Sequence, residues 1–166
     1  AVDSAGSTAL HSCLAAGAVE TAGQLLDAGA VVDAKLDATG ENALHVAVAT
    51  AEVADNAELL DRVIAAATDS AINATDKKQM SPLLTACKEQ RPVAVKALLR
   101  NPVVDVVTPD GSKTAAIHYA VQHPELRPLV PKLIERKADV NAVDSAGSTA
   151  LHSCLAAGAV ETAGQL

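Results

Sequence analysis

Short stretches with helical spacing of apolar residues alternate with polar, glycine-containing segments along the whole chain. Near the start, Leu10 and Leu14 share one such stretch, and a second one follows Gly17. Ser7 or Thr8 precedes the first stretch and can cap a helix through its hydroxyl group. Each predicted helix has only about ten residues, too few for a helix to be stable alone. The pattern therefore predicts an all-α fold in which helix pairs stabilise one another by packing.

The chain repeats itself on two scales. Residues 1–25, AVDSAGSTALHSCLAAGAVETAGQL, recur without a mismatch as residues 142–166, at an offset of 141 residues. Within that unit a more diverged segment opens at Asp3, Asp37, Asp76 and Asp110, and the copied stretch opens in the same way at Asp144. The pattern predicts one solenoid domain over residues 1–166, with repeats at about 3–36, 37–75, 76–109 and 110–143 and a partial repeat at 144–166.

Three departures from the repeat pattern carry their own expectations. The second repeat has about five extra residues somewhere in 49–73, which predicts a longer second helix or a longer helix–helix loop. The third repeat has Gln79 in place of the turn glycine and Leu84 in place of the histidine. The fourth carries prolines in its second-helix region, so that helix is expected to be short and to begin near Pro128 or Pro131.

Several copies of one motif make a family resemblance plain. The segments are Thr8-Ala9-Leu10-His11, Ser81-Pro82-Leu83-Leu84 and Ala115-Ala116-Ile117-His118, and later in the repeats Leu25-Leu26 before Gly29-Ala30 and Leu133-Ile134 before Ala138-Asp139-Val140-Asn141. They resemble the ankyrin repeat, which has a period of about 33 residues and a T-P-L-H motif. The resemblance implies an ankyrin-type helical solenoid with short β-turn or hairpin tips between helix pairs.

The resemblance also assigns the recurring histidines a structural role. In the family, each imidazole bridges the turn backbones of adjacent repeats, and this role is expected for His11, His45, His118 and His152. Because these histidines recur at repeat spacing, each lies about one layer, ~10 Å, from the next. Zinc needs its ligands within about 2.1 Å of one ion, so no metal site is expected.

Composition supports the solenoid and narrows its surroundings. The chain has one Tyr, no Trp and no Phe, and 49% of its residues are apolar. Small side chains let short helices stack closely. There is no apolar run of about 18 residues, which argues against a membrane span, and the net charge of −7 argues against nucleic acid as the main partner. Three widely spaced cysteines favour an intracellular location, cytoplasmic or cytoskeletal.

No catalytic or cofactor-binding motif occurs in the sequence. The Asp that opens each repeat is expected to stabilise a turn, and Cys13, Cys87 and Cys154 are expected to be core residues. An enzyme needs different residues that converge on one pocket, whereas here similar residues recur along a line. The chain is therefore expected to be non-catalytic and to bind no cofactor.

Charge is distributed unevenly along the repeats. Residues 1–76 have a net charge of −10 and residues 77–141 a net charge of +5. Turn tips and first-helix faces form the recognition surface of ankyrin-like proteins, so the resemblance places a candidate protein-binding patch in the basic half. Its members are Lys77, Lys78, Met80, Lys88, Glu89 and Lys113. A role of these residues in solubility alone is the alternative.

Three function classes follow. The preferred one is a segment of a long tandem array of 141-residue units with a scaffold or cytoskeletal role, because the offset copy is perfect while the four repeats are diverged. A discrete module that binds a protein on its concave face is the alternative, and an engineered fibre- or ring-forming protein is a weaker one. Both ends carry internal-type sequence, without the atypical caps of solenoids, which predicts head-to-tail self-association.

Overall fold

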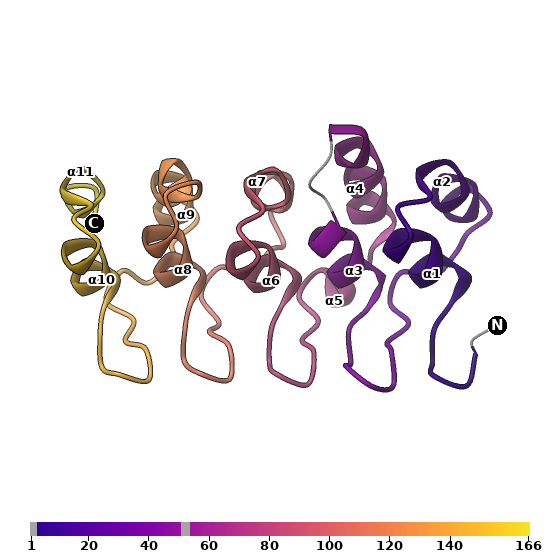
Figure 1. The fold of residues 1–166 in the computed structure, drawn as a ribbon, viewed down its shortest axis with the longest axis horizontal. Helices are drawn as coiled ribbons and strands as arrows, with labels where there is room; N and C mark the ends of the chain where they lie inside the picture. Colours follow the sequence, from indigo (N-terminus) through magenta and orange to yellow (C-terminus); the bar gives the residue numbers. More distant parts are fainter. Residues whose placement is uncertain (1–2, 51–53) are drawn as a thin grey trace.

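Stacked helix pairs form an elongated row in the computed structural model, which describes residues 3–50 and 54–166 (Figure 1). Pairs 1 to 5 consist of α1 and α2, α3 and α4, α6 and α7, α8 and α9, and α10 and α11. The bounds are α1 Ala9–Ala15, α2 Val19–Asp27, α3 Ala43–Thr50, α4 Ala54–Ala66, α5 Asp69–Ile72, α6 Pro82–Lys88, α7 Pro92–Arg100, α8 Ala116–Gln122, the 3₁₀ helix η1 Arg127–Leu129, α9 Val130–Glu135, α10 Ala150–Ala156 and α11 Val160–Ala163. The expectation of an all-α, ankyrin-type solenoid is confirmed.

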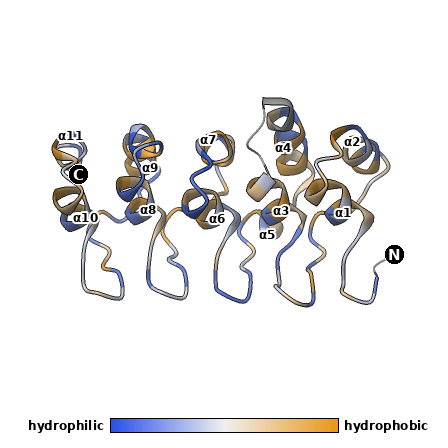
Figure 2. Cartoon of the chain, in the orientation of Figure 1, coloured by the Kyte–Doolittle hydropathy of each residue, from blue (hydrophilic) through white to orange (hydrophobic). Residues whose placement is uncertain are grey.

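The elements lie in three layers. The second helices of the pairs form one row, the first helices form a parallel row beneath it, and the connecting tips project on the far side (Figure 1). Each helix packs on its counterpart in the neighbouring pair, so that α1 contacts α3 and α2 contacts α4. One continuous core, formed mainly by Leu, Val, Ile and Ala, runs through all the pairs, and the tips are more polar than the helices (Figure 2).

Local sequence explains where the first helices begin and end. The Thr8 hydroxyl accepts a hydrogen bond from the amide of His11, and the Ser81 hydroxyl accepts one from the amide of Leu84. After α1, Gly17 has a φ of 68°, a left-handed conformation that favours glycine and ends a helix.

The aspartates that open the repeats stabilise their turns, as expected. In four of the five, one carboxylate oxygen accepts hydrogen bonds from the amides two and four residues on, at 2.7–2.9 Å: Asp3, Asp76, Asp110 and Asp144. The exposed Asp37 differs, because main-chain bonds from Gly40 to Leu36 and from Leu36 to Glu41 close its turn.

The structure also accounts for the irregular repeats. In the second repeat α4 has 13 residues, against nine in α2 and α7, and the short helix α5 follows it. The insertion therefore includes a longer second helix, while residues 51–53 of the expected range lie outside the described residues. In the fourth repeat the second helix is short, with Pro128 in η1 and α9 starting at Val130, as the prolines predicted.

The cysteines are free thiols in this fold. Cys87 and Cys154 are buried, as predicted for core residues, and Cys13 is half-buried. Burial raises the pKa of the Cys87 thiol to about 12. Among the described residues, no helix is long and apolar enough to cross a membrane.

Candidate functional site

Main-chain hydrogen bonds join the projecting tips of the first four repeats into a continuous edge. They run from Asp37 N to Ala5 O (3.0 Å), from Lys77 N to Thr39 O (2.9 Å) and from Gly111 N to Lys78 O (3.1 Å). The backbones lie so close that a Cβ at Gly111 would be 3.0 Å from the Lys78 carbonyl oxygen. This edge fixes the relative positions of the side chains that the tips carry.

The basic residues of the tips serve two different purposes. Lys77 is partly committed to structure, because its ammonium group donates to the Asp37 carbonyl at 2.6 Å. Lys78 and Lys113 are exposed, and neither forms an ion pair with another described residue. Lys113 has a φ of 60°, in the place that glycine takes in other turns. The tips of repeats 3 and 4 therefore present positive charge to solvent.

Met80 differs from the expectation that it projects with these lysines. Its side chain is only 5% exposed and belongs to the core. Its backbone donates to the Asp76 carboxylate and accepts a hydrogen bond from His45. An apolar side chain at this turn position gains more from burial than from exposure, so Met80 anchors the tip and is not part of its exposed surface.

Lys88 and Glu89 lie apart from the tips. Both are exposed, Lys88 in the last turn of α6 and Glu89 as its C-terminal cap. The tip precedes α6, and seven helical residues span about 10 Å. The structure therefore brings Lys77, Lys78 and Lys113 together on the tips and leaves Lys88 and Glu89 at the other end of the first-helix row.

The histidines bridge repeats wherever a following turn is present. The imidazole of His45 lies 3.0 Å from the Met80 carbonyl, and that of His118 lies 3.0 Å from the Ala142 carbonyl and 3.2 Å from that of Ser148. Burial lowers the pKa of His45, and the Met80 carbonyl opposes this effect only in part. The expected structural role is thus observed for these two residues.

The other two histidines make only part of this arrangement. His11 faces the Ala34 carbonyl, but among the described residues its buried Nε2 forms no hydrogen bond. Burial lowers its pKa. His152 is exposed, and its Nδ1 contacts Thr149. Each ring serves its own repeat, and no group of three or more metal-ligating side chains comes together in the described part of the chain.

Two arginines connect second helices, and sequence reasoning missed both. Arg136 donates to three carbonyls of the preceding repeat, those of Leu99 (2.6 Å), Pro102 (3.0 Å) and Val104 (3.2 Å). Arg62 donates to the Gly23 carbonyl (2.9 Å) and pairs with Asp27 (2.6 Å). A glycine inside a helix was the available signal, since a Cβ at Gly23 would lie 2.5 Å from the guanidinium of Arg62.

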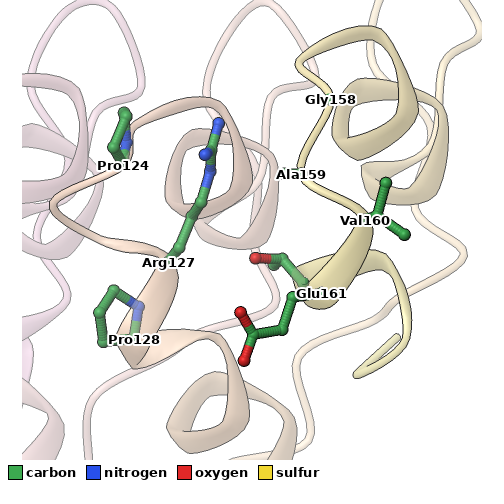
Figure 3. Close-up of a pocket in the computed structure, with 8 residues that line it drawn as sticks. Pro124, Arg127, Pro128, Gly158, Ala159, Val160 and Glu161 are labelled. Atoms are coloured by element: carbon green, nitrogen blue, oxygen red, sulfur yellow. The ribbon is translucent and has the colours of Figure 1, made fainter.

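A cavity of about 540 Å³ lies between pairs 4 and 5, where η1 faces the start of α11 (Figure 3). Pro124, Arg127 and Pro128 line one side, and residues 158–162 line the other. The Arg127 guanidinium donates to the Val121 carbonyl at 3.1 Å, and Figure 3 shows Glu161 pointing in a different direction. The cavity therefore presents no converging set of polar groups.

Comparison with known proteins agrees with this architecture. A family model described as ankyrin repeats (3 copies) matches residues 49–144. The neurogenic locus notch homolog protein 2 of Homo sapiens is 34% identical over 133 residues, which is 80% of this chain and 5% of that protein. The notch homolog protein 1 of Xenopus tropicalis is 31% identical over 138 residues, or 83% of this chain and 5% of that protein.

These relatives are much longer than the matched region, of which the chain spans about one-twentieth. The likeness therefore concerns a repeat region and not a whole protein. Ankyrin repeats are protein-interaction modules and are typically non-catalytic. The helix pairs, the tips and the bridging histidines, together with the family match over more than half of its length, show that the chain belongs to the ankyrin repeat family.

Proposed function

We propose that the chain is a segment of a tandem array of four-repeat units that serves as a non-catalytic, protein-binding scaffold. The observation that carries the proposal is a contrast between two identical sequences. The head copy, residues 1–25, and the tail copy, residues 142–166, have the same residues but are covered on opposite faces.

One face of the repeat is covered only in the head copy. Leu10 and Leu14 are 1% and 2% exposed there, because α3 packs on α1. The corresponding Leu151 and Leu155 of the tail copy are 44% and 60% exposed. Two leucines on one helix face would each gain about 1.5–3 kcal/mol from full burial, so this face of the sequence is suited to a following repeat.

The opposite face is covered only in the tail copy. Cys154 and Thr162 are buried against pair 4, whereas Cys13 is half-buried and Thr21 is exposed. The sequence shared by the two copies thus fits a preceding fourth repeat and a following second repeat. Units joined in tandem need no interface other than those already present.

Glycines support the same interpretation. A Cβ at Gly6 would lie 2.9 Å from the Lys35 carbonyl oxygen, and one at Gly23 would meet Arg62. Gly147, the tail counterpart of Gly6, has no such neighbour within 4 Å, and Gly164, the counterpart of Gly23, has only atoms of its own repeat nearby. Both glycines become necessary only when a second repeat follows.

The test is to extend the chain after Leu166 with the sequence of residues 26–75. We expect hydrogen exchange of the α10 amides to slow to the rate of the α1 amides, and the denaturation midpoint to rise. A matched control carries a glycine/serine-rich extension of the same length. Unchanged exchange in α10 of the extended chain would refute the proposal.

The three free cysteines support an intracellular location for such a scaffold, cytoplasmic or cytoskeletal, because reducing compartments keep thiols unpaired. Localisation of the parent protein by immunofluorescence after cell fractionation tests this part. Recovery from a secreted fraction would argue against it.

A discrete binding surface on the tips is the second candidate, favoured by the exposed charges of Lys78 and Lys113 together with Lys77. Such a surface suits an acidic protein segment. A poly-glutamate peptide is the probe, measured by fluorescence anisotropy at two salt concentrations. We expect Lys78→Glu and Lys113→Glu to weaken binding, and Lys96→Glu, on the exposed side of α7, to leave it unchanged. Equal effects of all three variants would point to net charge alone.

A further inference from the structure

We infer that a second copy of this chain docks its tail copy, residues 142–166, onto pair 2 in place of the head copy, residues 1–25. Copies of the chain then associate by exchange of identical segments. This goes beyond the tandem array, which concerns units within one chain.

The acceptor surface is the face of pair 2 that the head copy covers. Leu14 and Gly17 of the head lie against Ala47, Thr50, Leu59 and Leu60, and α2 packs on α4. These contacts involve the part of the head that the tail duplicates. The tail side chains that correspond to Leu14 and Val19 are Leu155 and Val160, which are exposed in this structure. The tail therefore carries the same contact residues, already folded and unoccupied.

The lengths of the two segments also match. Exchange releases residues 1–25, and residues from Leu26 onward stay with pair 2. The ion pair between Asp27 and Arg62 is therefore kept within the acceptor. The tip contact is also preserved, because Ala146 can offer its carbonyl to the Asp37 amide as Ala5 does. Nothing beyond residues 142–166 is needed from the incoming chain.

The free-energy balance favours exchange. In a solenoid, stability is approximately the sum of an intrinsic contribution from each repeat and an interface contribution between neighbours. A single pair of short helices is unstable on its own, so the intrinsic contribution opposes folding and the interfaces favour it. Exchange replaces the interface between head and pair 2 by the same interface between tail and pair 2. One fewer helix pair has to be ordered for the same number of interfaces.

The tail is the better occupant for a second reason. In its own chain it is already packed on pair 4, where Ala150 and Cys154 are fully buried. The head has no such support, and the equivalent Ala9 and Cys13 are only half-buried. Each chain offers one tail and one acceptor on different surfaces, so the contact is heterologous and produces open chains of molecules.

The experiment compares the same substitution in the two copies. Leu155→Glu changes an exposed tail residue, so it leaves the isolated chain folded but places a charge in the exchanged interface. Leu14→Glu changes the identical position in the head, where it weakens the hold of the head on pair 2 and frees the acceptor. Sedimentation velocity over a range of chain concentrations reports the association, and circular dichroism reports the fold of pairs 2 to 4.

We expect the wild type to associate as concentration rises, Leu155→Glu to associate at least tenfold more weakly, and Leu14→Glu to associate at lower concentration than the wild type. The association rate becomes independent of concentration at high concentration, since release of the head then limits it. If Leu14→Glu unfolds the chain, Leu14→Ala gives the same direction with a smaller effect.

Three results would overturn the inference. One is a wild type and a Leu14→Glu variant that stay monomeric at all concentrations. Another is association that Leu155→Glu does not weaken. The third is association that Leu14→Glu leaves unchanged or weakens, which would indicate direct stacking of the tail on the outer face of an intact head. None of these results bears on the extended-chain test of the tandem array, so the two proposals fail separately.

Discussion

Asn42 is the residue whose replacement tests the account of the tips most directly. It is fully buried at the start of α3, in the position that Thr8 and Ser81 occupy in other repeats. Its side-chain oxygen accepts from the amide of His45 at 3.1 Å, and its side-chain nitrogen donates to the Ala71 carbonyl at 2.9 Å. It therefore joins the cap of α3 to the short helix α5.

The two hydrogen bonds can be separated by two substitutions. Asn42→Thr keeps a capping hydroxyl and loses only the bond to Ala71. That carbonyl still accepts from the amides of Asn73 and Ala74, so the loss of free energy of unfolding is about 1 kcal/mol. Asn42→Ala also leaves the buried amide of His45 without a partner, which raises the loss to about 2–3 kcal/mol.

Urea denaturation followed by far-ultraviolet circular dichroism measures both variants, and the Asn42→Ala variant should also melt about 5–10 °C lower than the wild type. A loss below about 0.5 kcal/mol for Asn42→Ala would refute the reasoning. Equal losses for the two variants would show that the cap contributes nothing. Repeat 4 supplies the reverse experiment, because Ala115 occupies the same position without a capping side chain. We expect Ala115→Ser to stabilise the chain by about 0.5–1 kcal/mol.

Further predictions concern the other contacts between and within repeats. Arg136→Ala should lower the free energy of unfolding by about 2 kcal/mol, because three carbonyls lose a charged donor; Arg136→Lys should recover less than half, measured by urea denaturation. Gln79→Gly should raise the melting temperature, because Gln79 has a φ of 60°, and relief of that strain, less the chain entropy that glycine adds, is worth about 0.5–1 kcal/mol; an unchanged or lower value would contradict this. Burial depresses the pKa of His45 below its ordinary value of 6.5, so the unfolded chain binds the proton more readily. Stability should therefore be constant above about pH 6.5 and fall as the pH drops below it; a His45→Gln variant should show a shallower fall in denaturation midpoints between pH 7 and pH 5.

Features that depend on neighbours in the sequence could be predicted from the sequence. The turn aspartates act on amides two and four residues away, and the prolines of the fourth repeat displace a helix start within their own segment. Met80 was misplaced because its turn position was taken as exposed in every repeat. Its apolar side chain marked it as different from Ser7, Glu41 and Thr114 at the same position.

Features that depend on stacking could not be predicted in the same way. Arg62 and Arg136 reach carbonyls more than 30 residues earlier in the chain, and only the stacked arrangement brings these groups together. The position of the tip lysines had the same cause, since main-chain bonds between repeats set the edge that carries them. The separation of Lys88 and Glu89 from this edge follows from the length of α6.

The unequal bonding between pairs has a mechanical consequence. Arg62 links pairs 1 and 2, Lys77 and His45 link pairs 2 and 3, and Arg136 links pairs 3 and 4. Between pairs 4 and 5, within the described residues, His118 supplies the side-chain bonds, and the cavity of about 540 Å³ lies at the same junction. A row of stacked pairs carries tension in series, so a pull along the row parts this junction first. In an array of such units, extension would then proceed by one rupture for each unit, as in a spring with a built-in safety link at regular intervals.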